Sequence, residues 1–244
     1  MMSTDDPKPS VLIIRITPPP STYEEVPPPT DDEPYYQQLL DELTLRVSVM
    51  TVSSPSDAIK SLQMKQPSIV ISTTETLAVE ENFPVLQEVL DRVREGTSAI
   101  IMGMYPEYAE SADMKVLFSQ AGLSWNTTNV VGATLTVNQA ATGSKLAAAL
   151  PARYTTRALL LNNVAFSDAW YTADCTSHPY AVDPSEARPL GESAVALGHV
   201  ADGKLGYVGD VYALSESVAI ILAMCGLPSG KQLTGLEQLQ SLRL

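Results

Sequence analysis

The sequence predicts a single α/β domain in which helices cover both faces of a mostly parallel sheet. Two observations carry this prediction. Four strand-like segments alternate with helix-like segments within the first 102 residues, which is the pattern of parallel strands joined by right-handed crossovers. The strand-like segments are short runs of β-branched and apolar residues, as in strands that are buried on both faces. With 45% hydrophobic residues among 244, the chain can bury a sizeable core.

The first strand is expected at residues 11–16, whose sequence is VLIIRI. A helix should follow at 34–43, and the alternating segment 46–52 predicts the second strand. The next helix has a clear start. Ser54 can cap it, a proline fits its first turn, and Asp57 lies near the positive end of the helix dipole.

The same alternation continues through the next unit. Residues 68–72 predict a third strand, and the apolar residues of 83–95 recur at helical spacing. Gly96 ends that helix, and the fourth strand is expected at 97–102. Four strands joined through helices predict a sheet with helices on both faces.

The second half of the chain is less periodic. A hairpin is expected around residues 201–203, where Asp-Gly is a strong turn signal, and a nearly all-apolar helix near the end should be buried. The expected elements are a helix at 112–121, a strand at 130–137, a short helix at 142–150, a strand at 157–161, an irregular insertion at 166–193, strands at 194–200 and 204–208, and the buried helix at 214–225.

Prolines and acidic residues are concentrated in the N-terminal part of the chain. Nine of the 18 prolines lie in residues 1–34, and residues 1–42 hold nine acidic and two basic residues, a net charge of −7. We expect a flexible N-terminus at 1–10, one domain at 11–228 with an acidic proline-rich loop at 18–34, and a C-terminal tail at 229–244 that includes a short helix. The loop is interpreted as an insertion rather than a ligand of an aromatic-grooved domain, because no basic residue flanks its prolines.

Composition excludes several classes of function. The net charge of −13 argues against binding to nucleic acid, which needs clustered Lys and Arg. No apolar run reaches the roughly 18 to 20 residues that cross a bilayer, and the acidic start does not resemble a leader peptide, so we expect a cytoplasmic protein without membrane contact. Two cysteines form neither a disulfide framework nor a four-thiolate metal site. No Walker or Gly-x-Gly-x-x-Gly loop is present, so no cofactor is expected.

No motif for nucleophilic catalysis is complete. The turn after the fourth strand, where a nucleophile elbow would lie, carries Met104, and no Gly-x-Ser-x-Gly occurs. Cys175 and His178 are close in sequence but fall in the expected irregular insertion. Cys225 lies on the buried helix, where a thiol behaves as a small hydrophobe. His199 falls in a strand and is interpreted as structural. The sequence leaves the catalytic residues unknown and predicts no metal site.

A ligand site is expected at the carboxyl ends of the strands, where open parallel sheets bind ligands. Asp210 lies just before the buried helix in a segment rich in glycine and tyrosine, and the turn after the fourth strand adds two further candidates. The predicted ligand-binding residues are Gly103, Tyr105, Tyr207 and Asp210. The alternative for Asp210 is that it caps the following helix or closes a turn.

Four stretches carry a resemblance to a known family: residues 98–105, 121–125, 158–164 and 204–211. Together with the order of elements, they resemble the class I glutamine amidotransferase-like superfamily, with the ThuA-like and GIFT-type branches closest. The resemblance extends over most of residues 10–227. It implies a flavodoxin-like three-layer sandwich, but it does not imply a mechanism.

The sequence departs from the amidotransferase pattern at the catalytic residues. Met104 lies where the family has its cysteine nucleophile, and neither His178-Pro-Tyr nor His199-Val-Ala supplies a His-x-Glu pair. Glutaminase activity is therefore not expected. The resemblance to the branches that lack this triad implies a small-molecule role, for example one related to carbohydrates, or a protein-interaction role.

Three functional hypotheses follow. The first is a catalytically degenerate amidotransferase-like domain that binds a small molecule or a protein partner at the strand ends. The second is an enzyme of unknown reaction, a hydrolase or one related to carbohydrates, that uses Asp210 with Tyr105, Tyr207 and a histidine. The third is a scaffold subunit that acts through the loop at 18–34. The sequence leaves the ligand and the oligomeric state open.

Overall fold

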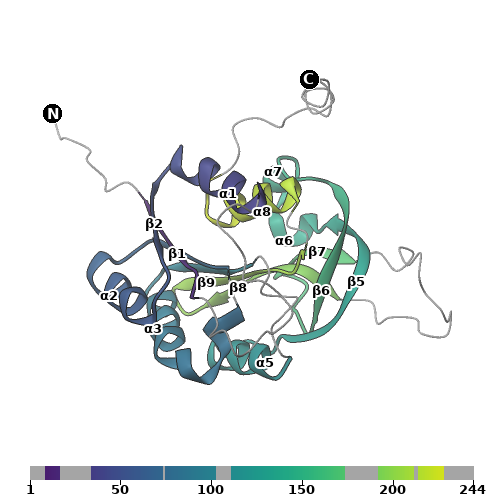
Figure 1. Ribbon diagram of the computed structural model, residues 1–244. Helices are drawn as coiled ribbons and strands as arrows, with labels where there is room; N and C mark the ends of the chain where they lie inside the picture. Colours follow the sequence, from purple (N-terminus) through teal and green to yellow (C-terminus); the bar gives the residue numbers. More distant parts are fainter. Residues whose placement is uncertain are drawn as a thin grey trace.

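The described part of the chain forms one large sheet with helices against it. The structure is a computed structural model and describes residues 9–16, 34–73, 75–102, 111–173, 192–211 and 214–227. The sheet has nine strands: β1 (Ser10–Ile14), β2 (Ser48–Val52), β3 (Ile69–Ser72), β4 (Ser98–Ile101), β5 (Asn126–Val137), β6 (Arg153–Asn162), β7 (Ala169–Ala173), β8 (Ser193–Val200) and β9 (Gly203–Val208). Their order is β2-β1-β3-β4-β9-β8-β6-β5-β7 (Figure 1).

The first five strands in that order form a parallel half. β2, β1, β3, β4 and β9 all pair in parallel with their neighbours. β1, β3 and β4 are buried along almost their whole length, which explains their continuous apolar sequences. The four strands predicted within residues 11–102 are confirmed.

The other half of the sheet is antiparallel and closes on itself. β5 pairs with both β6 and β7, and β8 pairs with both β6 and β7, so these four strands form a barrel-like ring. β8 then pairs with β9, also antiparallel, through the hairpin predicted around residues 201–203. The turn between them has Ala201 in the left-handed region, at φ 50°.

These pairings overturn the predicted fold class. Within the described residues, five of the nine strand pairings are antiparallel, so the expectation of a mostly parallel, flavodoxin-like three-layer sandwich is wrong. Strands and helices alternate as far as β6, but β5 and β6 pair antiparallel although α6 and α7 lie between them. The connections from β6 to β7 and from β8 to β9 are too short for the crossover that parallel neighbours need.

Two local predictions are also corrected. The segment 166–193, expected to be an irregular insertion, contains β7. The helix expected at 142–150 is replaced by two single turns, α6 (Gln139–Thr142) and α7 (Ser144–Ala147).

Helices pack against both faces of the sheet. α1 (Pro34–Thr44) and α8 (Ser215–Met224) lie on one face, and the helices on the other face are α2 (Pro55–Lys65), α3 (Phe83–Arg94) and α5 (Ser111–Gln120) (Figure 1). The 3-10 turns η1 (Glu75–Ala78) and η2 (Glu80–Asn82) precede α3. The core correspondingly divides into two apolar clusters, one on each side of the parallel strands.

Helix ends follow the predicted local chemistry. The hydroxyl oxygen of Ser54 accepts a hydrogen bond from the backbone N–H of Asp57 at 3.1 Å, which confirms the predicted cap of α2. Gly96 adopts a left-handed φ of 114° just after α3, as its stop signal predicted. α8 is buried over most of its surface, also as predicted.

Several predictions lie wholly or largely outside the described residues. These are the proline-rich loop at 18–34, the flexible N-terminus and the C-terminal tail at 229–244, so the domain boundaries stay predictions. In the described part of the chain, no helix has the length and apolar character needed to cross a membrane.

Candidate functional site

The parallel strands β1, β3 and β4 are each followed by a residue that continues the ladder at their carboxyl ends. The backbone N–H of Arg15 donates to Val52, that of Thr73 to Ile14, and that of Met102 to Ser72, at 2.9 to 3.2 Å. Side chains alternate along a strand, so Arg15, Thr73 and Met102 lie on the face occupied by Ile13, Ile71 and Ile100. That is the face covered by α1 and α8.

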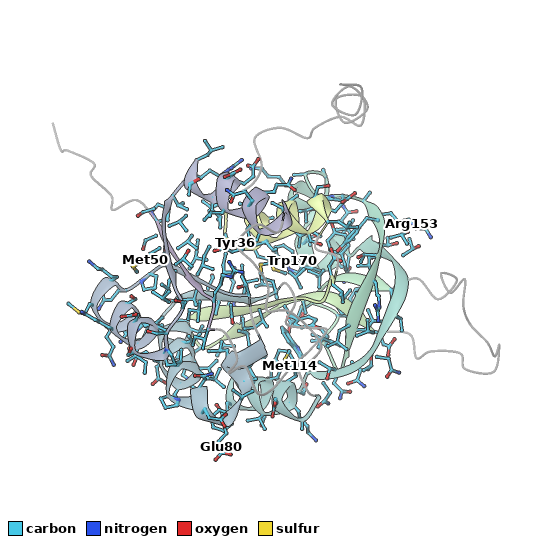
Figure 2. All side chains as sticks on the ribbon, viewed as in Figure 1. Tyr36, Met50, Glu80, Met114, Arg153 and Trp170 are labelled. Carbon is cyan, nitrogen blue, oxygen red and sulfur yellow. The ribbon has the colours of Figure 1, made fainter. Side chains whose placement is uncertain are left out.

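Arg15, Thr73 and Met102 form a row across the carboxyl ends of the strands, and Arg15 is a buried cation in this row. The residue is only 9% exposed, and its Cζ lies 4.1 Å from the ring centroid of Tyr36. Figure 2 shows Tyr36 between α1 and the sheet. The aromatic face attracts the guanidinium and fixes its direction, a geometry that suits recognition of carboxylate or phosphate groups.

Thr73 brings a buried hydroxyl to the same row. It is 8% exposed, and its Oγ1 has no hydrogen-bond partner among the described residues. In the register of β1 and β3, Ile14 pairs with Ser72, so Thr73 follows directly beside Arg15. A buried hydroxyl without a partner is unfavourable by about 1–3 kcal/mol. A ligand at this edge would relieve that deficit.

Asp210 occupies a different, enclosed position. It is 1% exposed and forms an isolated antiparallel bridge with Ala158 of β6. One carboxylate oxygen accepts from the Thr156 hydroxyl. The other accepts from the Ser217 hydroxyl and, at 2.9 Å, from the backbone N–H of Leu214.

These contacts give Asp210 a structural role. Its carboxylate accepts from the N–H of Leu214, the residue before α8, and from the Ser217 hydroxyl in the first turn, so Asp210 closes the turn that leads into the helix, one of the two alternatives that the sequence left open. Tyr154 lies close enough that burial and the Asp210 carboxylate both raise the pKa of its phenol. A ligand role for Asp210 stays a prediction.

Tyr207 faces the opposite side of the sheet. It is fully buried, its hydroxyl donates to the Leu159 carbonyl at 3.0 Å, and its ring meets Phe118 edge to face at 6.0 Å. Burial raises the pKa of Tyr207 well above the ordinary value, so the phenol is neutral. Because Tyr207 contacts the α5 side and Asp210 contacts α8, the structure does not bring these two predicted residues together. Gly103 and Tyr105 lie outside the described residues.

The structure also separates His199 from Asp210. His199 pairs with Lys204 at the start of β9, whereas Asp210 follows the end of that strand. Six residues of strand span roughly 20 Å, too far for a shared proton. His178 and Cys175 lie outside the described residues. Within the described ranges, no three His, Cys, Asp or Glu side chains group closely enough to hold a metal ion.

Cys225 should be chemically inert in the native protein. Burial raises the pKa of its thiol to about 12. In a Cys175→Ser variant at pH 8, we expect native Cys225 to react with a disulfide reagent more than about a hundred-fold slower than in denaturant, because little thiolate is present. Stopped-flow absorbance would measure both rates. Equal rates would contradict the burial of this thiol.

Sequence reasoning missed Arg15 and Thr73, the two polar residues of the row at the carboxyl edge. The signals were present but weak. Arg15 is the one charged residue in the run of 11–16, and Thr73 extends a strand that was expected to end at residue 72. A charged residue within a buried strand is rarely found without a specific partner. The polar side chains Thr156 and Ser217, which hold Asp210, were also missed, although Thr156 lies on the buried face of β6.

The similarity to known proteins is confined to structure. No protein-family model matches the chain, and no curated protein matches it significantly. A protein from Bacteroides uniformis described as ThuA-like superimposes with a TM-score of 0.55 at 10% identity, over 93% of both chains. A cytoplasmic protein from Salmonella typhimurium gives 0.53 at 10% identity, over 90% of this chain and all of the other.

A β-galactosidase from Bacillus circulans sp. alkalophilus also matches, with a TM-score of 0.52 at 10% identity. The match covers 90% of this chain but 31% of the β-galactosidase, so this chain corresponds to less than a third of that enzyme. At such identities the matches establish the fold alone. The chain therefore shares the fold of a protein described as ThuA-like, one of the two branches that the sequence resembles.

Proposed function

We propose that this domain binds a small anionic ligand at the carboxyl edge of its parallel strands, with Arg15 and Thr73 as the binding residues, and that it lacks glutaminase activity. The observation that carries the proposal is the unpartnered, buried hydroxyl of Thr73 beside the oriented guanidinium of Arg15. A carboxylate or phosphate accepts hydrogen bonds from both groups at once. Met104, in place of a nucleophile, supports binding without amide hydrolysis.

The choice of probes follows the one substrate class that a similar structure suggests. The β-galactosidase acts on galactosides, so galacturonate and galactose 1-phosphate are suitable anionic probes. Neutral galactose is the matched control because it differs from galacturonate by the carboxylate. We expect both anionic sugars to raise the melting temperature in a thermal-shift titration, and galactose to do so much less.

Substitutions at the two residues should both weaken binding of the anionic probe, and Thr73→Val should also have a distinctive effect on stability. Arg15→Gln should weaken binding of the anionic probe about tenfold or more, the loss expected for a charged hydrogen bond. Thr73→Val should weaken binding several-fold. Without ligand, Thr73→Val should leave the melting temperature unchanged or higher, because it removes an unpartnered buried hydroxyl. If the Thr73 hydroxyl were purely structural, Thr73→Val would instead lower the melting temperature and leave binding unchanged.

Arg94→Gln is the control variant. Arg94 lies on α3 and pairs with Asp91 at 2.6 Å on the surface, so its loss should not change binding. The proposal fails if galactose and galacturonate shift the melting temperature equally, or if Arg15→Gln and Arg94→Gln bind the anionic probes alike.

A further inference from the structure

Tyr36 belongs to an apolar stripe of α1 that extends to the carboxyl edge of the sheet. Tyr36, Leu39 and Leu43 recur at spacings of three and four residues, and each is at most 6% exposed. All three belong to the apolar cluster that also contains residues of β1. Because α1 joins the parallel strands β1 and β2, it runs back from their carboxyl ends to their amino ends. Its first turn, with Tyr36, therefore lies over the edge where Arg15 is found.

The helix that carries Tyr36 is firmly supported. α1 packs against α8 and β2, and Figure 1 shows α1 and α8 side by side on one face of the sheet. On its exposed side the Gln37 amide donates to the Asp41 carboxylate at 2.7 Å. At its end the backbone N–H of Val47 donates to the Leu43 carbonyl at 2.9 Å. A side chain held by a rigid element loses little conformational entropy when a ligand binds.

The contact between Tyr36 and Arg15 restricts how the guanidinium can donate. Its Cζ lies 4.1 Å from the ring centroid, over the ring, so the aromatic face occupies one side of the cation. The N–H donors of arginine form a fixed, planar fork, and placing the ring on one side of Arg15 therefore sets the directions that this fork can take. An aliphatic side chain of similar size would fill the same space, but it would not attract the cation.

We infer that Tyr36 is a positioning residue of the anion site, so that α1 as well as the strand ends determines the affinity for the ligand. The inference rests on the proposed function, because the direction of Arg15 matters only if Arg15 binds the anion. Tyr36 acts through Arg15: it holds the guanidinium in the direction in which the fork meets the ligand. Without the ring, the arginine side chain would lose more rotamer freedom on binding, and the affinity would fall.

Calorimetric titration of the full chain with galacturonate would test this role. Tyr36→Phe keeps the aromatic face and should bind within about two-fold of wild type. Tyr36→Leu keeps an apolar side chain but removes the ring, and should weaken binding about five-fold or more. Leu43→Val is the matched control, because Leu43 lies on the same stripe two turns from Tyr36. It should lower the melting temperature and leave the affinity unchanged.

A double-mutant cycle separates positioning from support of the fold. In an Arg15→Gln background, Tyr36→Leu should cause no further loss of affinity, because the group that it positions is already absent. If Tyr36→Leu weakens binding equally in both backgrounds, Tyr36 acts on the fold of α1 rather than through Arg15, and the inference is overturned.

The Nε–H resonance of Arg15 gives a direct readout of the ring in the absence of ligand. The ring current of Tyr36 should displace this resonance in wild type and in Tyr36→Phe, and the displacement should be lost in Tyr36→Leu. If Arg15→Gln weakens binding but Tyr36→Leu binds like wild type, the positioning role is wrong and the anion site stands. If Arg15→Gln leaves binding unchanged, the anion site and the positioning role both fail.

Discussion

Replacing Asp210 by alanine should lower the free energy of unfolding by about 3 kcal/mol, because three buried donors lose a charged acceptor at once. The donors are the Thr156 and Ser217 hydroxyls and the backbone N–H of Leu214. The substitution also removes the negative charge from the first turn of α8. Urea denaturation followed by circular dichroism would measure the loss.

Two milder variants separate the structural role from a ligand role. Ser217→Ala and Thr156→Val each remove one donor and should cost about 1 kcal/mol. Asp210→Asn keeps the size of the side chain and should lie between wild type and alanine. If Asp210→Ala were as stable as wild type but lost its thermal response to anionic sugars, Asp210 would belong to the ligand site and the structural assignment would be wrong.

Gly203→Ala should be at least as damaging, with a loss of about 3 kcal/mol or more. A Cβ at this position would lie 2.0 Å from the carbonyl oxygen of Val93 and 2.3 Å from that of Thr97. Both contacts are with backbone, so the end of α3 would have to move away from β9. Overpacking of this kind typically costs 1–3 kcal/mol and occasionally more. For a chain of this size the melting temperature should fall by roughly 6–12 °C.

Gly132→Ala is the matched control. Gly132 is also a strand glycine, in β5, but a Cβ there would meet nothing within 4 Å. Its substitution should change stability by less than about 0.5 kcal/mol, as is usual at surface positions. Differential scanning calorimetry of both variants makes the comparison. Similar losses in the two variants would show that strand flexibility, rather than the approach of α3, explains the effect.

Local chemistry in the sequence predicted the parallel half of the fold well. The continuous apolar runs of β1, β3 and β4 and the capping serine of α2 depend on neighbouring residues, and all are found as expected. The antiparallel half was mispredicted because strand pairing is not a local property. The run around Trp170 and Tyr171 has high β-propensity, yet its partners in β5 and β8 are distant in sequence.

The contacts of the candidate site were also missed because they join residues that are distant in sequence. Asp210 was identified correctly as a carboxylate at a strand end, but its hydroxyl partners come from β6 and α8, which no local pattern connects. Gly203 was interpreted as a turn glycine, whereas the close approach of α3 is what excludes a side chain. Arg15 and Thr73 become neighbours only through the parallel register of β1 and β3.

The position of the ligand is most directly tested by backbone amide NMR of the isotopically labelled protein titrated with galacturonate or galactose 1-phosphate. Saturable shift changes should centre on Arg15, Thr73 and Met102, and they should disappear in Arg15→Gln. Shift changes centred instead on His199 and Lys204 at the opposite strand ends, or saturable changes that persist in Arg15→Gln, would contradict an anion site at the carboxyl edge.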